Sequence, residues 1–307
     1  MKPLMYKPGS ERAPRRPDTI ESYSITPDTP GTLLPALIAL MPMRKKTTVK
    51  DYLKHRQVKI NGTVSTQFDL PLKPGDEILV NISREWQEFS HPRMKIVYED
   101  DYLIVVEKGY GLLSVGTEKV KTETAYSIIK DYLKRKDPRN KVFVVHRLDQ
   151  HTSGLMMFAK SVQAKETMQH NWNNMVLDRR YAAIVEGRPD TDSGVVESYL
   201  AENSEHLMYS ADGPDHGKLA VTRWQAVRSR NGYTLMDVSL DTGRKNQIRV
   251  HMKDLGHPIA GDRRYGARTS PLHRLALHAR TLRFIHPVTR EDMNFSIPLP
   301  TGFTRLV

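Results

Sequence analysis

The feature that most constrains the fold is a series of short strand-like runs in the C-terminal two thirds of the chain. Apolar or alternating runs occur at residues 179–186, 219–228, 233–241, 246–252, 280–285 and 292–297. Several of them are separated by short turns that contain Gly or Pro, which leaves no room for the long crossovers that parallel strands need. We therefore predict an α+β fold with a mixed, largely antiparallel sheet.

Two helices are expected among these strands. Residues 124–135 carry apolar side chains at the helical spacing i, i+3, i+4, i+7 and i+8. Ser161 is expected to cap a second helix, in which apolar residues recur every four positions from Ala164 to Val176. Two further strands are expected at 94–99 and 102–108.

Changes in composition divide the 307 residues into four parts. Residues 1–20 are basic and Pro-rich, which predicts a disordered tail. Residues 21–83 are expected to form a small α/β unit, 84–92 a polar linker, and 93–307 the large unit that contains the strands described above. Two domains are the natural expectation for a chain of this length.

The small unit has recognisable local signals. Residues 33–40 form an apolar helical stripe in which Pro35 is tolerated in the first turn. Thr47 or Thr48 is expected to cap a second helix. Asn61-Gly62 is a strong signal for a two-residue hairpin turn, and residues 44–59 carry seven basic residues against the single acid Asp51. This helix is either a phosphate-binding surface or an ordinary solvated face.

The charge balance points to a polyanionic partner. The formal net charge is +12, and the chain contains no cysteine. A basic chain of this kind favours nucleic acid, which binds through phosphate contacts and counterion release. Without cysteine there is no disulfide framework, thiolate nucleophile or Cys-type zinc site. The histidines fall in no tight ligand spacing, so no metal site is expected, and neither a signal peptide nor an apolar run of membrane length is evident.

Three side chains are candidates for chemistry, and each has a structural alternative. Asp149 lies where an apolar strand enters a Thr-Ser-Gly turn, which suits a catalytic carboxylate or an Asp that caps its own turn. Arg249, in the run expected to be a strand at 246–252, could hold a carboxylate through a bidentate pair or belong to a structural salt bridge. Tyr181 shares a strand face with the apolar residues Ala183 and Val185, which by itself favours a core tyrosine over a residue of the site.

The segment HRLDQHTSGLMMFAK at 146–160 resembles the signature of the RluA-type pseudouridine synthases. The resemblance continues in RRYAAIVEG at 179–187, in GKLAVTRW at 217–224, in TGRKNQIRVHMKDLGHPIAGDRRYG at 242–266 and in RLALHARTLRFIHP at 274–287. Residues 31–82 resemble an S4-type RNA-binding domain, although GTLLPALIALM stands in place of its usual basic opening. Lys108-Gly109-Tyr110-Gly111 likewise departs from the family's Lys-Pro-x-Gly.

This resemblance implies an enzyme that isomerises uridine to pseudouridine in structured RNA without a cofactor. It implies that Asp149 acts as nucleophile or base, that Tyr181 stacks on the target base, and that Arg249 lies near Asp149 and lowers its pKa. Arg147 would occupy the space left by the flipped base. The remaining residues expected to bind substrate or RNA are His146, Thr152, Arg244, Gln247 and His251, with Lys46, Lys50, Lys54 and Arg56 in the small unit.

The expected substrate is large-subunit ribosomal RNA, because the combination of this catalytic domain with an S4-like domain resembles members that act there. A tRNA substrate is the main alternative. Two other classes remain open: a non-catalytic RNA-binding or ribosome-assembly factor, and an enzyme that hydrolyses a glycosidic bond. A cytoplasmic monomer is the default expectation.

Overall fold

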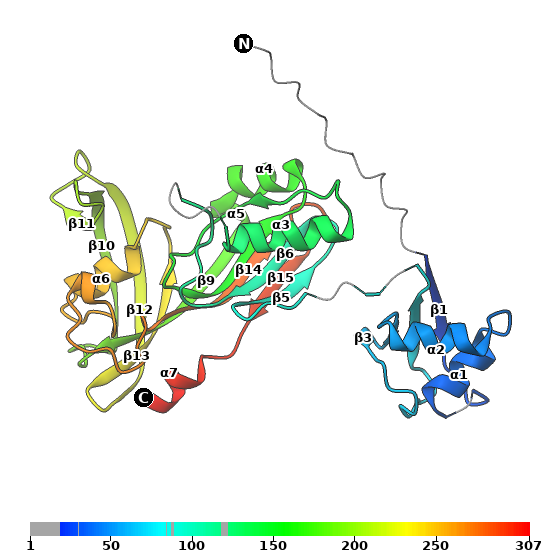
Figure 1. The fold of residues 1–307 in the computed structure, drawn as a ribbon. Coiled ribbons are helices and arrows are strands. Elements are labelled where there is room, and N and C mark those ends of the chain that lie inside the picture. The colour runs from blue at the N-terminus through cyan, green and yellow to red at the C-terminus, as the bar shows by residue number, and fades with distance from the viewer. Residues whose placement is uncertain (1–18, 30, 84, 87–88, 118–121) are drawn as a thin grey trace, which may run out of the picture. The chain divides into compact units, whose positions relative to one another are not determined.

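The structure, a computed structural model, describes residues 19–29, 31–83, 85–86, 89–117 and 122–307. The chain divides into a small unit, Met1–Glu88 with Arg135–Pro138, and a large unit, Phe89–Lys134 with Arg139–Val307 (Figure 1). Most of the predicted tail at 1–20 lies outside the described residues. Its last residue, Ile20, opens the first strand of the small unit and therefore does not belong to a tail.

The small unit packs two helices against a four-stranded sheet of order β1-β4-β2-β3. Asn61 and Gly62 join β2 to β3 with φ angles of 48° and 81°, as the predicted two-residue hairpin turn requires. The expected caps Thr47 and Thr48 are wrong: α2 begins at Lys46, so both threonines lie inside its first turn. The elements are β1 (Ile20–Ser24), α1 (Leu33–Leu40), α2 (Lys46–Lys54), β2 (Val58–Ile60), β3 (Thr63–Val64) and β4 (Glu77–Asn81).

The large unit is built on an eleven-stranded sheet whose main path runs β11-β10-β12-β13-β9-β14-β8-β6-β5. Among its described ladders only the short β8–β14 pairing is parallel, which confirms the largely antiparallel prediction. The strands are β5 (Met94–Glu99), β6 (Leu103–Lys108), β7 (Phe143–Val144), β8 (Ser153–Ala159), β9 (Val176–Glu186), β10 (Ser193–Glu202), β11 (Met208–Ala211), β12 (Lys218–Arg230), β13 (Tyr233–Leu240), β14 (Leu277–Ile285) and β15 (Asp292–Ser296).

Helices cover both faces of the β5–β6–β8 half of the sheet. Helix α3 (Ala125–Lys136) packs Ile129 against Ile104 of β6 on one face. Helix α4 (Val162–His170) packs Met168 against the other face. Because strand residues alternate between faces, β8 must be apolar on both sides, and all seven of its residues are buried.

Ser161 caps α4 as predicted, since its Oγ accepts a hydrogen bond from Ala164 N at 3.1 Å. The helix does not run on to Val176, however. Asn171 donates its side-chain amide to Thr167 O at 2.9 Å and ends α4, and a single turn, α5 (Trp172–Met175), follows. Val176 instead opens β9, where it pairs with Phe284 of β14.

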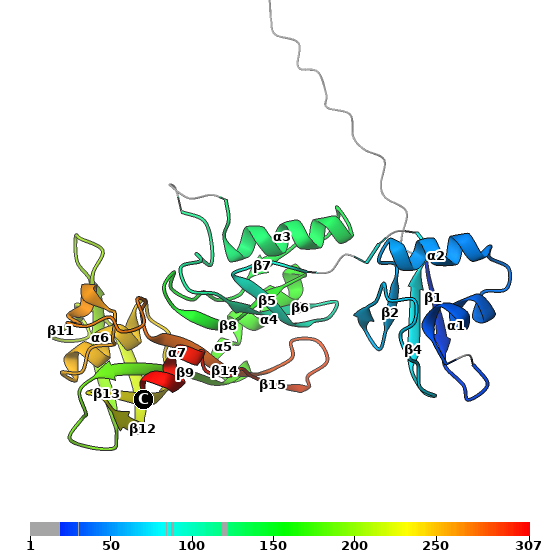
Figure 2. The same ribbon diagram turned by 60° about the horizontal axis from the view of Figure 1, so that its bottom comes forward.

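The segment 246–252, expected to be a strand, is the helix α6 (Gln247–Asp254). A run this short is compatible with both the strand period of two residues and the helical period of 3.6 residues. Polar and apolar residues of this segment are buried alike, so the alternation of polar and apolar residues did not indicate which side faces the core. Ile248 and Met252, four residues apart, pack in the main core, while Val250 packs against Leu200 in a second cluster. Both views place α6 over the β10–β12 half of the sheet (Figures 1 and 2).

The C-terminal segment completes the large unit. The 3₁₀ turn η1 (Arg263–Tyr265) follows α6, and the chain ends in α7 (Thr301–Leu306), whose Phe303 is fully buried in the main core. The sequence pattern did not predict the strands β10 and β11, in each of which a single residue, Leu200 or Met208, is buried.

Candidate active site

A cavity of about 750 Å³ opens in the large unit between the β7–β8 loop, β9 and the β13–α6 loop. The side chains of Asp149, Tyr181 and Arg249 all line it. These residues lie far apart in the sequence, and the sheet brings them together because β8 and β9 both flank β14. The structure therefore places the three candidate catalytic residues around one space.

Asp149 lies in the loop between β7 and β8, which is held from both sides. Thr152 N donates to Asp149 O at 3.1 Å, and the neighbouring Leu148 exchanges two hydrogen bonds with Ser114 Oγ. The carboxylate itself forms no hydrogen bond or ion pair within the described part of the chain. It is thus oriented by its backbone and left available to the cavity.

The electrostatics of Asp149 differ from the expectation. Burial raises the pKa of Asp149, and the nearby charges of Arg249, Lys108 and Arg147 lower it without reversing the direction. The expected lowering of the Asp149 pKa by Arg249 is present, but desolvation outweighs it and the pKa is raised. Within the described part of the chain, no cation forms a direct pair with this carboxylate that would reverse the direction.

Arg249 holds a different carboxylate. Its Nε and Nη2 donate to the two oxygens of Asp262, each at 2.7 Å, and its Nη1 donates to Asn246 Oδ1 at 3.1 Å. The guanidinium also lies over the ring of Tyr265, with 4.6 Å between Cζ and the ring centroid. The bidentate pair foreseen for Arg249 exists, and its partner is Asp262, which is 3% exposed.

Tyr181 is both a core residue and a cavity residue. Its ring packs against the clusters on either side of β9, and the side chain also lines the cavity. Burial raises the pKa of Tyr181. The phenol forms no hydrogen bond with a described residue, so its hydroxyl is free to meet a substrate.

Lys108 is a residue that the sequence did not single out for this site. Its side chain is fully buried, and Nζ donates to the carbonyl oxygens of Gly109, Leu112 and Gln150 at 3.1, 2.8 and 3.2 Å. Burial lowers the pKa of Lys108 to about 7, against an opposing effect of the nearby Asp149. The sequence signal that could have indicated this residue is its position at the end of the apolar strand β6.

Five of the predicted binding residues line the cavity: His146, Arg147, Thr152, Arg244 and Gln247. His146 accepts a hydrogen bond from Met157 N at 3.0 Å, and burial lowers its pKa to about 3, so the ring is neutral. Arg147 is exposed and has no partner among the described residues. Arg244 is exposed as well, and its Nε donates a hydrogen bond to Leu219 O at 2.9 Å.

Two predicted contacts are structural instead. The amide of Gln247 is saturated: Nε2 donates to Val221 O and Thr222 Oγ1, and Oε1 accepts from Thr242 Oγ1 and Arg244 N. His251 is fully buried, with its ring nitrogens 2.7 Å from Thr222 Oγ1 and 3.0 Å from Ser198 Oγ. Neither side chain has an atom left for RNA, because the helix turns both toward β12.

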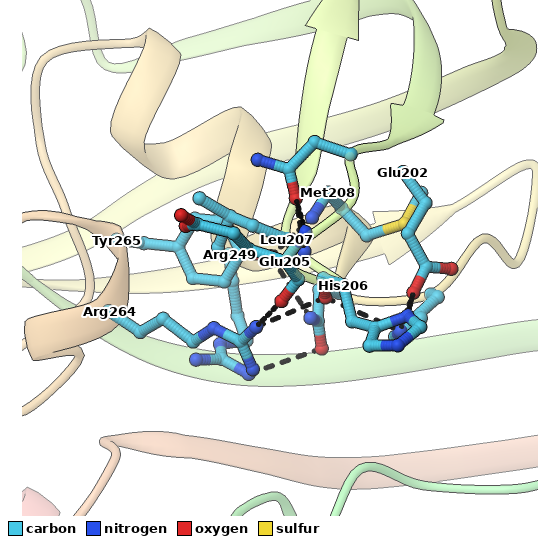
Figure 3. Close-up of polar contacts among 11 residues, drawn as sticks. Glu202, Glu205, His206, Leu207, Met208, Arg249, Arg264 and Tyr265 are labelled. Carbon is cyan, nitrogen blue, oxygen red and sulfur yellow. Dashed lines mark hydrogen bonds and ion pairs between the residues drawn. The ribbon is translucent and has the colours of Figure 1, made fainter.

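The turn between β10 and β11 lies beside Arg249 and Tyr265 (Figure 3). Arg264 Nη2 donates to Glu205 O and His206 O at 3.0 and 3.1 Å. Lys245, which lines the cavity, donates to Glu202 Oε1 at 2.5 Å. The sequence did not single out these contacts, since they join segments about forty to sixty residues apart.

The small unit carries its cations on one side of α2. Lys46, Lys50 and Lys54 recur every four residues and are exposed, whereas Val49, Tyr52 and Leu53 are buried. Arg56 is exposed just beyond the helix. Within the described residues, no cluster of three or more His, Asp or Glu is arranged to hold a metal ion, and no helix there has the length and apolarity to span a membrane.

The family model described as RNA pseudouridylate synthase matches residues 102–254. "Uncharacterized RNA pseudouridine synthase YjbO" of Bacillus subtilis (strain 168) is 34% identical over 81% of this chain and 89% of its own length. "Ribosomal large subunit pseudouridine synthase D" of Pasteurella multocida (strain Pm70) is 32% identical over 89% of both chains. The chain belongs to the RNA pseudouridine synthase family. It is therefore an isomerase that acts on RNA.

A solved structure supports the same assignment. "Human RNA Pseudouridylate Synthase Domain Containing 4" is 25% identical, has a TM-score of 0.57, and covers 68% of this chain and 90% of that one. The comparison confirms the resemblance to the RluA-type synthases, with which the ribosomal large subunit synthase D proteins are grouped. The roles of individual residues are a separate question.

Proposed function

We propose that this pseudouridine synthase modifies uridine in large-subunit ribosomal RNA, with Asp149 as the catalytic residue. The observation that carries the proposal is the Asp149 carboxylate, which faces the cavity without a protein partner among the described residues and is surrounded by cations. The choice of RNA rests on relatives such as the Pasteurella multocida protein, whose name specifies the ribosomal large subunit.

The reaction breaks the bond between N1 of uracil and C1′ of ribose and forms a bond between C5 and C1′. N1 gains a proton and C5 loses one, so no atom is added and no oxidant is needed. Ionised Asp149 serves as nucleophile or base, since both roles need a free carboxylate. Tyr181 lies across the same cavity, where its ring supports stacking on the base.

Uracil in a stacked helix or loop cannot reach a residue in this cavity, so the nucleotide has to flip out. Flipping costs a few kcal/mol, which phosphate contacts offset. Exposed Arg147, beside Asp149 on the same loop and without a partner among the described residues, is placed to occupy the vacated stack. The small unit, which we assign as S4-like, supplies further phosphate contacts through Lys46, Lys50, Lys54 and Arg56.

The first test replaces the catalytic carboxylate in the full-length protein. Asp149→Ala is expected to abolish pseudouridine formation, a loss of at least about 1,000-fold by analogy with removal of other catalytic groups. RNA binding should survive, because the phosphate contacts lie elsewhere. Release of tritium from [5-³H]uridine-labelled RNA measures turnover, and filter binding measures affinity. A variant that still turns over uridine would contradict the role of Asp149.

The second test identifies the RNA. Pseudouridines are mapped in total RNA from cells with and without this protein, and with the Asp149→Ala variant as a control for binding alone. A site in large-subunit ribosomal RNA that disappears in the two inactive strains supports the proposal. Loss of sites in tRNA instead would assign the enzyme to the alternative substrate, and release of free uracil would point to glycosidic hydrolysis.

A further inference from the structure

Arg249 acts electrostatically on the Asp149 carboxylate but forms its ion pair with a second carboxylate, that of Asp262. Arg249 lines the cavity beside Asp149, yet three of its five N–H bonds are taken by Asp262 and Asn246. The two remaining N–H bonds have no acceptor among the described residues. Arg249 therefore presents charge to the cavity, while its two shortest hydrogen bonds are to Asp262, which does not line the cavity.

The hold on Arg249 comes from several elements. Asp262 lies just before η1, where Ile259 O accepts its backbone N–H at 2.9 Å and its own carbonyl accepts from Tyr265 N at 3.0 Å. The ring of Tyr265 forms one wall for the guanidinium, and its hydroxyl accepts hydrogen bonds from Asn246 Nδ2 and Met208 N at 3.0 and 3.2 Å. Figure 3 shows Arg249 next to Tyr265 and the β10–β11 turn.

The bidentate geometry favours Asp262 over Asp149. A carboxylate that receives two parallel N–H bonds at 2.7 Å forms the strongest type of ion pair, and this one is shielded from water. Asp149 has no such bond. The side chain of Arg249 is 11% exposed, so it has little freedom to change partner while Asp262 is present.

We propose that Asp262 is a positioning residue for the isomerisation. It fixes Arg249 as an oriented counter-charge and prevents this arginine from closing onto the Asp149 carboxylate, which stays free to react. The inference deepens the proposed function, since it rests on Asp149 as the catalytic residue. Nothing in the reaction requires Asp262 to touch RNA, because its side chain is paired and buried.

Other charged groups also face Asp149 and have to be kept constant in any test. They are Lys108 on β6, Arg147 and His151 on the same loop, Lys245 before α6 and Tyr181 on β9. A substitution at Asp262 leaves all of them in place. Because the charge of Asp262 also raises the pKa of His151, its loss makes His151 less cationic, which opposes a lowering of the Asp149 pKa; a lowered acid limb therefore reports the release of Arg249.

The test is the pH dependence of kcat/KM for Asp262→Asn in the full-length enzyme. Loss of the Asp262 charge frees Arg249 to pair with Asp149, which favours the ionised carboxylate. The acid limb should move to lower pH by about one unit, and the plateau kcat should fall while KM for RNA is unchanged. A purely structural role would lower thermal stability and the active fraction without moving the limb.

Asp292→Asn is the matched control, because Asp292 forms an exposed bidentate pair with Arg283 away from the cavity. It should leave the acid limb and kcat as in the wild type. Asn246→Gly is the second variant, since glycine tolerates the φ of 52° at this position; it removes the third contact to the guanidinium and the Asn246 Nδ2 hydrogen bond to the Tyr265 hydroxyl, and it leaves the Asp262 pair in place. It should give a smaller shift in the same direction.

An unmoved or raised acid limb in folded Asp262→Asn overturns the inference. If that variant fails to fold, an unmoved limb in Asn246→Gly does so. The proposed function fails separately, namely if Asp149→Asn retains turnover. An inactive Asp149→Asn together with an unmoved limb in Asp262→Asn would leave Asp149 catalytic and reject the role of Asp262.

Discussion

At the scale of single residues, the site depends on a balance between burial and charge at Asp149. Burial raises its pKa, while Arg249 and Lys108 lower it without a direct bond. A carboxylate held this way retains more basicity than one locked in an ion pair, and the proposed reaction uses its ionised form. The free enzyme should therefore lose activity as the pH falls through a value above the ordinary Asp pKa of about 3.9.

A substitution of Lys108 should shift the pKa of Asp149 in the opposite direction from a substitution of Asp262. Burial lowers the pKa of Lys108 to about 7, so below that pH the side chain is protonated and favours ionised Asp149. Lys108→Met removes that charge and should move the acid limb of kcat/KM to higher pH. Three carbonyl oxygens also lose their donor, at a cost of about 1–3 kcal/mol for each group left unpaired.

Turnover measured against pH and urea denaturation check this prediction. Lys130→Met, at an exposed position on α3, is the matched control and should alter neither the limb nor the midpoint. A limb that stays in place in folded Lys108→Met would show that the charge of Lys108 does not reach Asp149.

At the scale of elements, the close contact between β8 and β14 determines where the catalytic loop ends. Gly154 has a φ of 116°, and a Cβ built there would lie 2.1 Å from Ala279 O. The parallel pairing of Ser153 and Gly154 with His278 and Ala279 thus admits only glycine at this position. The Thr-Ser-Gly turn noted in the sequence has a structural role that its spacing alone did not reveal.

Gly154→Ala should destabilise the enzyme by about 3 kcal/mol or more, because both the backbone conformation and the contact with Ala279 are lost. Urea denaturation of the full chain measures the change. Gly213→Ala is the control: its added Cβ meets nothing within 4 Å and its φ is not in the left-handed region, so its free energy of unfolding should stay within about 0.5 kcal/mol of the wild type. Equal stability of the two variants would contradict the steric argument.

Sequence periodicity predicted elements well where one face is buried and the other exposed. The helix at 125–136 and the strands at 94–99 and 103–108 are of this kind or are continuously apolar. It failed at α6, where six consecutive residues are buried and tertiary packing chose the helix. It also missed β10 and β11, whose stability comes from pairing with distant partners rather than from local contrast.

At the scale of the whole molecule, the charge of +12 is distributed over both units. The small unit presents Lys46, Lys50 and Lys54 along one stripe of α2, and the large unit presents Arg147 and Arg244 at the cavity. Each unit can contribute phosphate contacts, and the free energies of contacts on one RNA reinforce each other. Affinity should therefore depend on both units and on salt.

Replacing Lys46, Lys50 and Lys54 together with Gln should weaken RNA binding and reduce the slope of log affinity against log salt. If each lysine contacts a phosphate, the slope falls by about 0.7–0.9 per residue. Filter binding over a salt series measures it, and kcat at saturating RNA should be unchanged. The same substitutions at exposed Lys95, Lys130 and Lys253 of the large unit are the control. Equal losses in both triples would leave the stripe on α2 without a special role.

The sequence by itself determined the class of fold, the family and three candidate catalytic side chains, all of which line the cavity. It could do so because the strand pattern and the HRLDQHTSG motif each consist of residues that are close in the sequence, so they can be recognised without knowledge of distant contacts. The tertiary structure alone decided that Arg249 pairs with Asp262, that Lys108 is buried next to Asp149, and that His251 and Gln247 belong to the packing of α6. Partners in these contacts are separated by up to 53 residues, as for His251 and Ser198, and burial in the folded protein selects them.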